Sequence, residues 1–157
     1  MIPSYINEQW QYSVVRFRED EIREMCFPDE NYDYDRLSAN SIFVGAYDGA
    51  QCVGLSVLQH AMMKYMYLYD LKVNKAYRGQ RIGKRLIEMS KKIAKSRGYR
   101  GIYTQGQDDN LGACLFYLNN GFIIGGLDTQ VYAGTSQEGK KDILFYLDAD
   151  KPSSEKA

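Results

Sequence analysis

Hydrophobic and polar residues alternate over residues 65–73, and this alternation predicts a β-strand. Side chains at every second position of a strand share one face. The residues expected together on one face are Tyr65, Tyr67, Tyr69, Leu71 and Val73. The tyrosines suit either a half-buried strand face or the wall of a substrate pocket.

A helical repeat of apolar residues follows this strand. The repeat is formed by Ile82, Leu86, Met89 and Ile93. This spacing is typical of one helix face, and Arg97-Gly98 supplies a stop signal. We therefore expect a helix over residues 82–97.

The other elements predict one mixed α/β domain. Apolar runs at 41–47 and 52–58 flank Asp48-Gly49, which indicates a hairpin. The further elements expected are a strand beginning within 5–18, helix and loop within the acidic stretch 19–35, a strand at 101–105, a short helix capped by Asp109 or Asn110 and ending at 119–121, and strands at 122–126 and 142–147. This order favours a single domain over residues 1–150, followed by a polar tail at 151–157.

The segment from Tyr77 to Arg85, called the basic segment below, lies between the predicted strand and helix. It places four cations around the first helical turn: Arg78, Arg81, Lys84 and Arg85. The helix macrodipole is positive at this end and favours acids there by roughly 0.3–1 kcal/mol each. A polyanionic ligand would explain the cations, because the free N–H groups of a helix start bind phosphate. The alternative is a strand–helix turn with solvated arginines.

Two common nucleotide-binding motifs do not fit the basic segment. A P-loop has four residues between its glycines and then Gly-Lys-Ser/Thr. Here Gly79 and Gly83 enclose three residues, and Arg85 follows Lys84. The Gly-x-Gly-x-x-Gly motif of dinucleotide-binding folds is also absent.

Composition narrows the class of protein. The 157 residues are 45% apolar and 25% charged, which is ordinary for a globular domain, and the net charge is zero. A neutral chain disfavours nucleic acid and acidic membranes as partners. Residues 1–5 show no signal-peptide pattern, and no apolar run approaches the ~20 residues that span a bilayer. We expect a cytoplasmic protein.

Cysteine and histidine usage argues against a metal centre. Cys26, Cys52 and Cys114 are odd in number, far apart and without metal-ligand spacing. His60 is the only histidine, which makes a Ser/His/Asp triad improbable. We expect no metal and reduced thiols, with Cys114 a buried structural residue.

The basic segment resembles the acetyl-CoA motif of the GNAT family of N-acetyltransferases. That motif reads Gln/Arg-x-x-Gly-x-Gly/Ala after a strand. Arg78, Ile82 and Gly83 match it, whereas Arg81 stands where the first glycine of the pair is usual. Backbone N–H groups bind the pyrophosphate, so the substitution affects mainly the local backbone angle.

A second GNAT motif follows in the usual order and at a typical separation. It reads Asn-x-x-Ala-x-x-Phe-Tyr-x-x-x-Gly-Phe, and the matching residues are Asn110, Ala113, Phe116, Tyr117, Gly121 and Phe122. The resemblance implies an α/β (mixed α+β) fold, with a central mixed sheet of splayed parallel strands flanked by helices. It also implies transfer of acetyl from acetyl-CoA to a primary amine by direct attack.

The resemblance assigns roles to individual residues. It makes Tyr117 the general acid for the departing coenzyme thiolate, although a core aromatic is the alternative. Leu71 and Val73 would bind the pantetheine arm through main-chain groups, and an N–H near Leu71 would polarise the thioester. Asn110 would bind the cofactor, cap a helix, or do both. The implied cofactor-binding residues are Leu71, Val73, Arg78, Gly79, Gln80, Arg81, Ile82, Gly83, Lys84, Asn110, Ala113 and Phe116.

The resemblance covers most of the chain and is closest to the streptothricin acetyltransferases. It is carried by residues 5–10, 52–54, 107–110 and 126–132. That branch tends to have an acidic pair where this chain has Tyr69-Asp70. Alternation places Tyr69, not Asp70, on the face of Leu71 and Val73. We therefore expect the Asp70 side chain to point away from the thioester.

The acceptor and the general base stay open at this point. Base candidates are Asp70, Asp128 in a loop resembling a substrate-binding segment, and an ordered-water relay. The acidic stretch 19–35 either attracts a cationic amine or is a solvated helix face. The alternatives are a streptothricin acetyltransferase, an acetyltransferase of another small amine or a protein amino group, and a weakly catalytic CoA-binding module. A homodimer is compatible with each.

Overall fold

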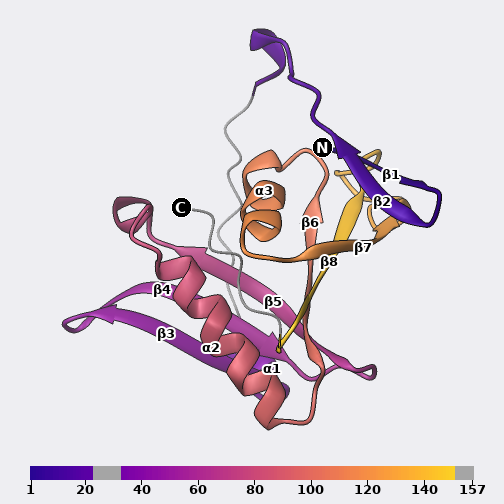
Figure 1. Cartoon of the computed structure of the whole chain (residues 1–157). Helices are drawn as coiled ribbons and strands as arrows, with labels where there is room; N and C mark the ends of the chain where they lie inside the picture. Colours follow the sequence, from indigo (N-terminus) through magenta and orange to yellow (C-terminus); the bar gives the residue numbers. More distant parts are fainter. Residues whose placement is uncertain (23–32, 151–157) are drawn as a thin grey trace.

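The structure is a computed structural model that describes residues 1–22 and 33–150 (Figure 1). Cys26, most of the acidic stretch and the predicted tail at 151–157 lie outside the described residues. The division into one domain and a tail therefore stays a prediction. Within the described part, the helices are too short or too polar to cross a membrane.

A sheet of six strands carries the fold, in the order β3-β4-β5-β6-β8-β7. Its strands are β3 (Ser41–Asp48), β4 (Gln51–Gln59), β5 (Tyr65–Val73), β6 (Gly101–Gln107), β7 (Ile123–Asp128) and β8 (Asp142–Asp148). The helices are α1 (Tyr34–Ser38), α2 (Ile82–Ser96) and α3 (Leu111–Asn119), with single 3-10 turns at Glu19–Glu21 and Lys75–Tyr77. β5 and β6 are parallel and the other neighbours are antiparallel. The predicted mixed sheet flanked by helices is confirmed.

The N-terminal region contains the strand expected to begin within residues 5–18 and a further strand before it. Strands β1 (Ile2–Ile6) and β2 (Gln9–Ser13) pair as a separate two-stranded hairpin. Asn7 and Glu8 form its turn with φ angles of 49° and 62°. Asn tolerates this left-handed conformation, and two such residues match the twist of a hairpin. The expected strand is therefore β2, and the turn joins it to β1, which the sequence did not predict.

The two long helices begin and end where capping residues stand. Helix α2 is followed by Gly98, whose φ of +80° suits a left-handed helix end. Helix α3 begins at Asn110, whose side chain accepts the backbone N–H of Ala113 at 3.1 Å. It ends before Gly121, which has a φ of +90°. Both predicted helices are confirmed to within a residue or two.

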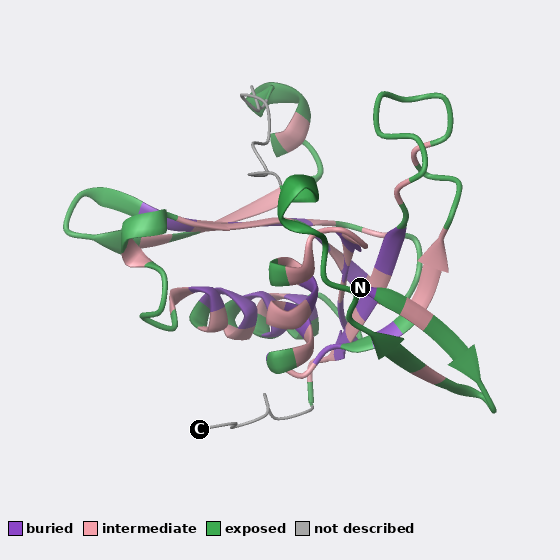
Figure 2. Ribbon diagram, turned by 90° about the horizontal axis from the view of Figure 1, so that it is seen from above, coloured by how far each residue is buried: buried purple, intermediate pink, exposed green. Residues whose placement is uncertain are grey.

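Helix α2 packs across β3 to β6 and α3 packs on β6 (Figure 1). The core-facing side of α2 contains the buried residues Gly83, Leu86, Ile87, Ser90, Lys91 and Ala94. Met89, expected on the apolar face, is 45% exposed. Ser90 takes a core position instead, because its hydroxyl bonds Leu86 O at 2.8 Å and meets the Ser56 hydroxyl of β4 at 3.1 Å. Figure 2 shows the buried residues gathered between α2, α3 and the sheet.

The parallel strands β5 and β6 separate partway along their length. Their register runs from Tyr65 opposite Gly101 to Tyr67 opposite Tyr103. Beyond this point β5 continues to Val73 and β6 to Gln107 without further pairing. The Thr104 hydroxyl donates to Leu68 O at 2.9 Å where the ladder stops. The predicted splay of the two strands is confirmed.

A β-bulge at Tyr69 overturns the predicted alternation of β5. Val57 of β4 pairs with Asp70 and the next residue, Leu58, pairs with Leu68, so Tyr69 is the extra residue. One extra residue reverses which face the following side chains occupy. Leu71 and Val73 therefore lie on the helix-covered face, whereas Tyr65 and Tyr67 lie on the other.

The tyrosines of that other face form a cross-strand stack. Tyr67 stacks on Tyr103 with ring centroids 4.9 Å apart, and Tyr103 stacks on Tyr146 at 5.6 Å. Each ring is directly opposite the next in register. The half-buried strand face therefore accounts for Tyr65 and Tyr67, and only part of the stack reaches the cleft described next.

Candidate active site

A cleft of about 1610 Å³ opens where β5 and β6 separate. Its walls come from the C-terminal half of β5, the start of α2, the end of β6, helix α3, and single residues of β8 and the β7–β8 loop. Among the predicted site residues, the cleft brings together Tyr69, Asp70, Leu71, Val73, Arg78, Gly79, Arg81, Ile82, Gly83, Lys84, Asn110, Ala113, Phe116 and Tyr117. Gln80 and Asp128 are predicted site residues that do not line it.

The start of α2 forms the basic end of the cleft. The first backbone bond of the helix runs from Arg85 N to Arg81 O at 3.0 Å. The N–H groups of the preceding residues 82–84 are therefore left at the helix end. Neither a side-chain cap nor an acidic residue occupies this first turn. This arrangement suits a bound phosphate, and it differs from α3, which Asn110 caps.

Arg81 holds the backbone angle that a glycine would normally provide. Its φ and ψ are 61° and 13°, in the left-handed region. For a residue with a side chain this conformation costs roughly 1–2 kcal/mol. The resemblance placed a glycine at this position, and the structure shows that the arginine adopts the conformation of that glycine.

The backbone of β5 faces the cleft at Leu71 and Val73. Asn74 N bonds Val53 O of β4 at 2.9 Å, so Asn74 points its backbone groups away from β6. Backbone groups alternate along a strand, so those of Val73 and Leu71 point toward the separated β6. The Arg78 Nε donates to Val73 O at 3.3 Å. An extended ligand could therefore pair with this strand edge in place of β6.

Tyr117 is the buried tyrosine of α3 that lines the cleft. Its ring packs on Phe122 and Phe145 with centroids 5.3 and 5.4 Å away, and only 9% of the residue is exposed. Burial raises the pKa of Tyr117, the Asp70 charge adds to the rise, and interaction with Thr104 opposes it. The hydroxyl therefore keeps its proton at neutral pH and can donate it to a developing anion.

Asp70 also lines the cleft, contrary to the expectation that it points away. The bulge at Tyr69 moves Asp70 to the face of Tyr65 and Tyr67, opposite to Leu71 and Val73, and the cleft reaches residues of both faces. Asp70 Oδ2 pairs with Lys72 Nζ at 3.2 Å, and burial lowers the pKa of Lys72. The carboxylate is close enough to Tyr117 to influence its pKa.

Asp128 has a structural role in the β7–β8 loop. Its Oδ1 accepts the backbone N–H groups of Gln130 and Val131 at 2.9 and 3.0 Å. These bonds form an Asx turn that starts the loop. Its assignment to the substrate stays a prediction.

The sequence prediction missed one acid of the cleft, Asp142. It begins β8 and is 5% exposed, and its Oδ1 accepts the hydroxyl of Tyr132 at 2.9 Å. Burial raises the pKa of Asp142, and burial likewise raises the pKa of Tyr132, to about 12. The available signal was an isolated acid directly before the apolar run 143–147. That signal is weak without knowledge of which elements meet there.

Cys114 is placed as the sequence suggested, inside α3 and fully buried. Burial raises the pKa of its thiol to about 11. It is therefore a poor nucleophile. Within residues 1–22 and 33–150, no cluster of acids, cysteines and histidines could hold a metal ion.

Comparisons with known proteins agree with this geometry. Streptothricin acetyltransferase A of Bacillus subtilis (strain 168) is 28% identical over 146 residues, which cover 93% of this chain and 84% of that protein. Streptothricin acetyltransferase of Escherichia coli is 29% identical over 85% of this chain and 71% of its own length.

Solved structures show the same fold. A provisionally named streptothricin acetyltransferase of Bacillus anthracis str. Ames, solved with acetyl coenzyme A, is 36% identical and has a TM-score of 0.68, over 74% of this chain and 69% of that one. Nourseothricin acetyltransferase superposes with a TM-score of 0.75 at 22% identity, over 94% of this chain and 82% of its own. The profile of the Acetyltransferase (GNAT) family matches residues 4–122. With both sequence motifs lining one cleft between splayed strands, the chain belongs to the GNAT family of acetyltransferases.

Proposed function

We propose that this protein transfers acetyl from acetyl-CoA to a primary amine of a small acceptor, with streptothricin as the leading acceptor. The observation that carries the proposal is the single cleft that joins an uncapped basic helix start to a buried, protonated tyrosine. The two sequence relatives described above are both named for streptothricin.

The residues at the basic end fit acetyl-CoA. Arg78 and Lys84 add charge around the open helix start, which suits the pyrophosphate. The exposed backbone edge at Leu71 and Val73 suits the amide groups of the pantetheine arm. Acetyl-CoA supplies an activated thioester carbonyl when bound.

The chain's own groups then manage protons. The attacking amine must be neutral, and Asp70 is a carboxylate that lines the cleft and whose charge raises the pKa of Tyr117. We assign Asp70 to accept the amine proton, directly or through water, and Tyr117 to donate a proton to the leaving thiolate. A backbone N–H near Leu71 would stabilise the tetrahedral oxyanion.

Release of the coenzyme thiol tests the acceptor. Purified protein with acetyl-CoA should produce free thiol when streptothricin is added, and mass spectrometry should show one added acetyl group. A panel of other small amines and a peptide amino group serves as comparison. If another amine releases thiol and streptothricin does not, that amine replaces streptothricin as the proposed acceptor. Binding of acetyl-CoA without any turnover would favour a CoA-binding module.

Two ligands test the cofactor assignment. The double variant Arg78→Ala/Lys84→Ala should bind acetyl-CoA more weakly but should bind an acetyl-pantetheine thioester, which lacks the phosphates, about as well as the wild type. Equal loss for both ligands would show that the basic segment does not bind phosphate. The expected homodimer and cytoplasmic location stay predictions, and sedimentation of the purified protein would test the dimer.

A further inference from the structure

The cleft contains a second carboxylate, Asp142, at the far end from the basic segment. In register it stands between Gln107 of β6 and Asp128 of β7, where the sheet ends. Only 5% of it is exposed, yet it lines the cleft. A buried carboxylate of this kind requires a strong partner, because loss of hydration is costly for a charge.

Within residues 1–22 and 33–150, other acids pair with a cation, whereas Asp142 does not. Asp70 pairs with Lys72, Asp109 with Lys140, and Asp148 with Arg100. In the part of the chain that the structure describes, no lysine or arginine pairs with Asp142, whose one hydrogen-bond partner is the Tyr132 hydroxyl. The charges nearest to it are Asp128 and Asp108, which are acids themselves.

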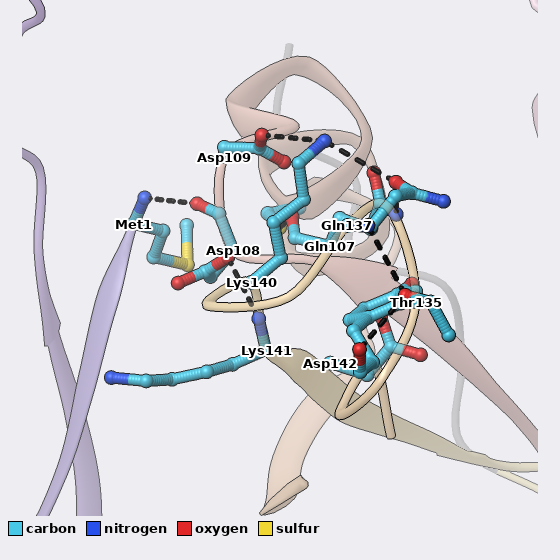
Figure 3. Close-up of polar contacts among 11 residues, drawn as sticks. Met1, Gln107, Asp108, Asp109, Thr135, Gln137, Lys140, Lys141 and Asp142 are labelled. Carbon is cyan, nitrogen blue, oxygen red and sulfur yellow. Dashed lines mark hydrogen bonds and ion pairs between the residues drawn. The ribbon is translucent and has the colours of Figure 1, made fainter. Parts of the chain in front are cut away.

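The β7–β8 loop holds Tyr132 at this position. Figure 3 shows the loop tied to the end of β6 near Asp142. The Gln107 side chain donates to Gln137 at 2.7 Å, Lys141 N donates to the Asp108 carboxylate at 3.2 Å, and Asp108 N donates to Lys141 O at 2.9 Å. Lys140 is occupied by Asp109 at 3.1 Å. Lys140 is therefore directed to Asp109, and the backbone of Lys141 is held by Asp108, while Asp142 lines the cleft.

The two cleft carboxylates differ in their relation to the proposed reaction. Asp70 stands on β5 and its charge raises the pKa of Tyr117, where the acetyl group would be transferred, whereas Asp142 lies opposite Gln107 at the end of β6. β5 and β6 pair only as far as Tyr67 opposite Tyr103, so the two carboxylates stand on opposite sides of the gap between the separated strands. An ammonium bound at Asp142 would thus lie away from the reacting carbonyl.

Resting on the proposed function, we propose that Asp142 binds a second ammonium group of the acceptor, which makes a molecule with two amino groups the preferred substrate class. One amine reacts beside Asp70 and Tyr117. The other stays protonated and pairs with the carboxylate of Asp142, with Tyr132 fixing the orientation of that carboxylate. Asp142 is then a specificity-determining residue that takes no part in proton transfer.

A matched series of acceptors tests this inference. Straight-chain α,ω-diamines are compared with monoamines of the same chain length in the thiol-release assay. Wild type should have a KM lower for the diamines by about ten- to a hundredfold, the range of a hydrogen-bonded charge. Asp142→Asn should remove this preference by raising the diamine KM, with kcat and the monoamine KM nearly unchanged.

Controls separate the outcomes. Asp150→Asn removes the same charge from an exposed pair with Lys95 and should keep the preference. Asn can still accept the Tyr132 hydroxyl, so Asp142→Asn should fold, which its melting temperature checks. Equal KM values for diamine and monoamine in the wild type, or equal changes for both in Asp142→Asn, would overturn the inference and leave acetyl transfer intact.

Calorimetric binding of a diamine to the CoA-loaded protein provides a readout that is independent of turnover. If no amine releases thiol, the proposed acetyl transfer is wrong. Even then, diamine binding that weakens about tenfold in Asp142→Asn would support the ammonium site. Unchanged diamine binding in Asp142→Asn would overturn the site.

Discussion

Gly83 lies directly against the ring of Phe116, and this contact joins the two sequence motifs of the family. A Cβ atom on Gly83 would lie 2.9 Å from the Cζ atom of Phe116. The absence of a side chain at Gly83 therefore lets the start of α2 approach α3. The cleft depends on this approach, because both helices contribute to its walls.

Gly83→Ala should destabilise the fold through this contact. Overpacking costs roughly 1–3 kcal/mol, and the better helix propensity of Ala offsets up to about 1 kcal/mol. Urea unfolding measures the net change in the free energy of unfolding. Gly112→Ala in α3 is the matched control, since its Cβ would meet only Asn110 Oδ1 at 3.9 Å, and it should be neutral or stabilising. Adding Phe116→Leu should recover part of the Gly83→Ala loss, and strictly additive effects would contradict the contact.

Arg81→Gly should be more stable than Arg81→Ala by about 1 kcal/mol. Both variants remove the guanidinium, so their difference in unfolding free energy isolates the left-handed backbone. The same pair at Arg85, which lies inside the right-handed helix, should show the opposite order, with Ala better by about 1 kcal/mol. An Arg81→Ala variant as stable as Arg81→Gly would mean that the helix start relaxes to another conformation.

Tyr117→Phe should lower kcat by about 10²–10⁴-fold with little change in acetyl-CoA affinity. The hydroxyl is the only group lost, and the ring contacts with Phe122 and Phe145 persist. Because burial raises the pKa of Tyr117 above its usual value, ionisation of this tyrosine should not reduce wild-type activity below about pH 10. Steady-state rates and calorimetric acetyl-CoA binding measure the two effects.

Tyr99→Phe is the control for this substitution. The Tyr99 hydroxyl bonds His60 Nδ1 at 3.1 Å, and Tyr99 does not line the cleft. Its kcat should match that of the wild type. A wild-type rate in Tyr117→Phe would instead exclude this residue as the acid.

Asp142→Asn should gain stability relative to the wild type as the pH rises from acid to neutral. Burial raises the pKa of Asp142 in the folded state. The pKa of an aspartate in the unfolded chain is about 3.9. The extra stability that the wild type gains from protonated Asp142 is therefore complete below that pH, and it is lost as the pH rises through the higher pKa of the folded state. Asn avoids the loss. Urea unfolding of both proteins across this range, in buffers free of amines, measures the difference, and a constant difference would contradict the burial of this charge.

The sequence by itself determined most of the regular structure. The apolar runs of β3 and β4, the apolar repeat of α2, and the caps at Asn110, Gly98 and Gly121 are local signals that depend on a few neighbouring residues. The two motifs also identified the family. Their residue types are set by local requirements, which are free backbone N–H groups at the start of α2 and close packing in α3.

Only the tertiary structure decided how the cleft is lined. The bulge at Tyr69 arises from the register between β4 and β5, and it changes the face of each residue from Asp70 onward. Asp142 is distant in sequence from both motifs, and only the placement of β8 beside β6 brings it to the cleft. Strand pairing and side-chain packing are long-range, so no local pattern in the chain could have shown that Asp70 pairs with a lysine and that Asp142 faces the cleft with none of the described lysines beside it.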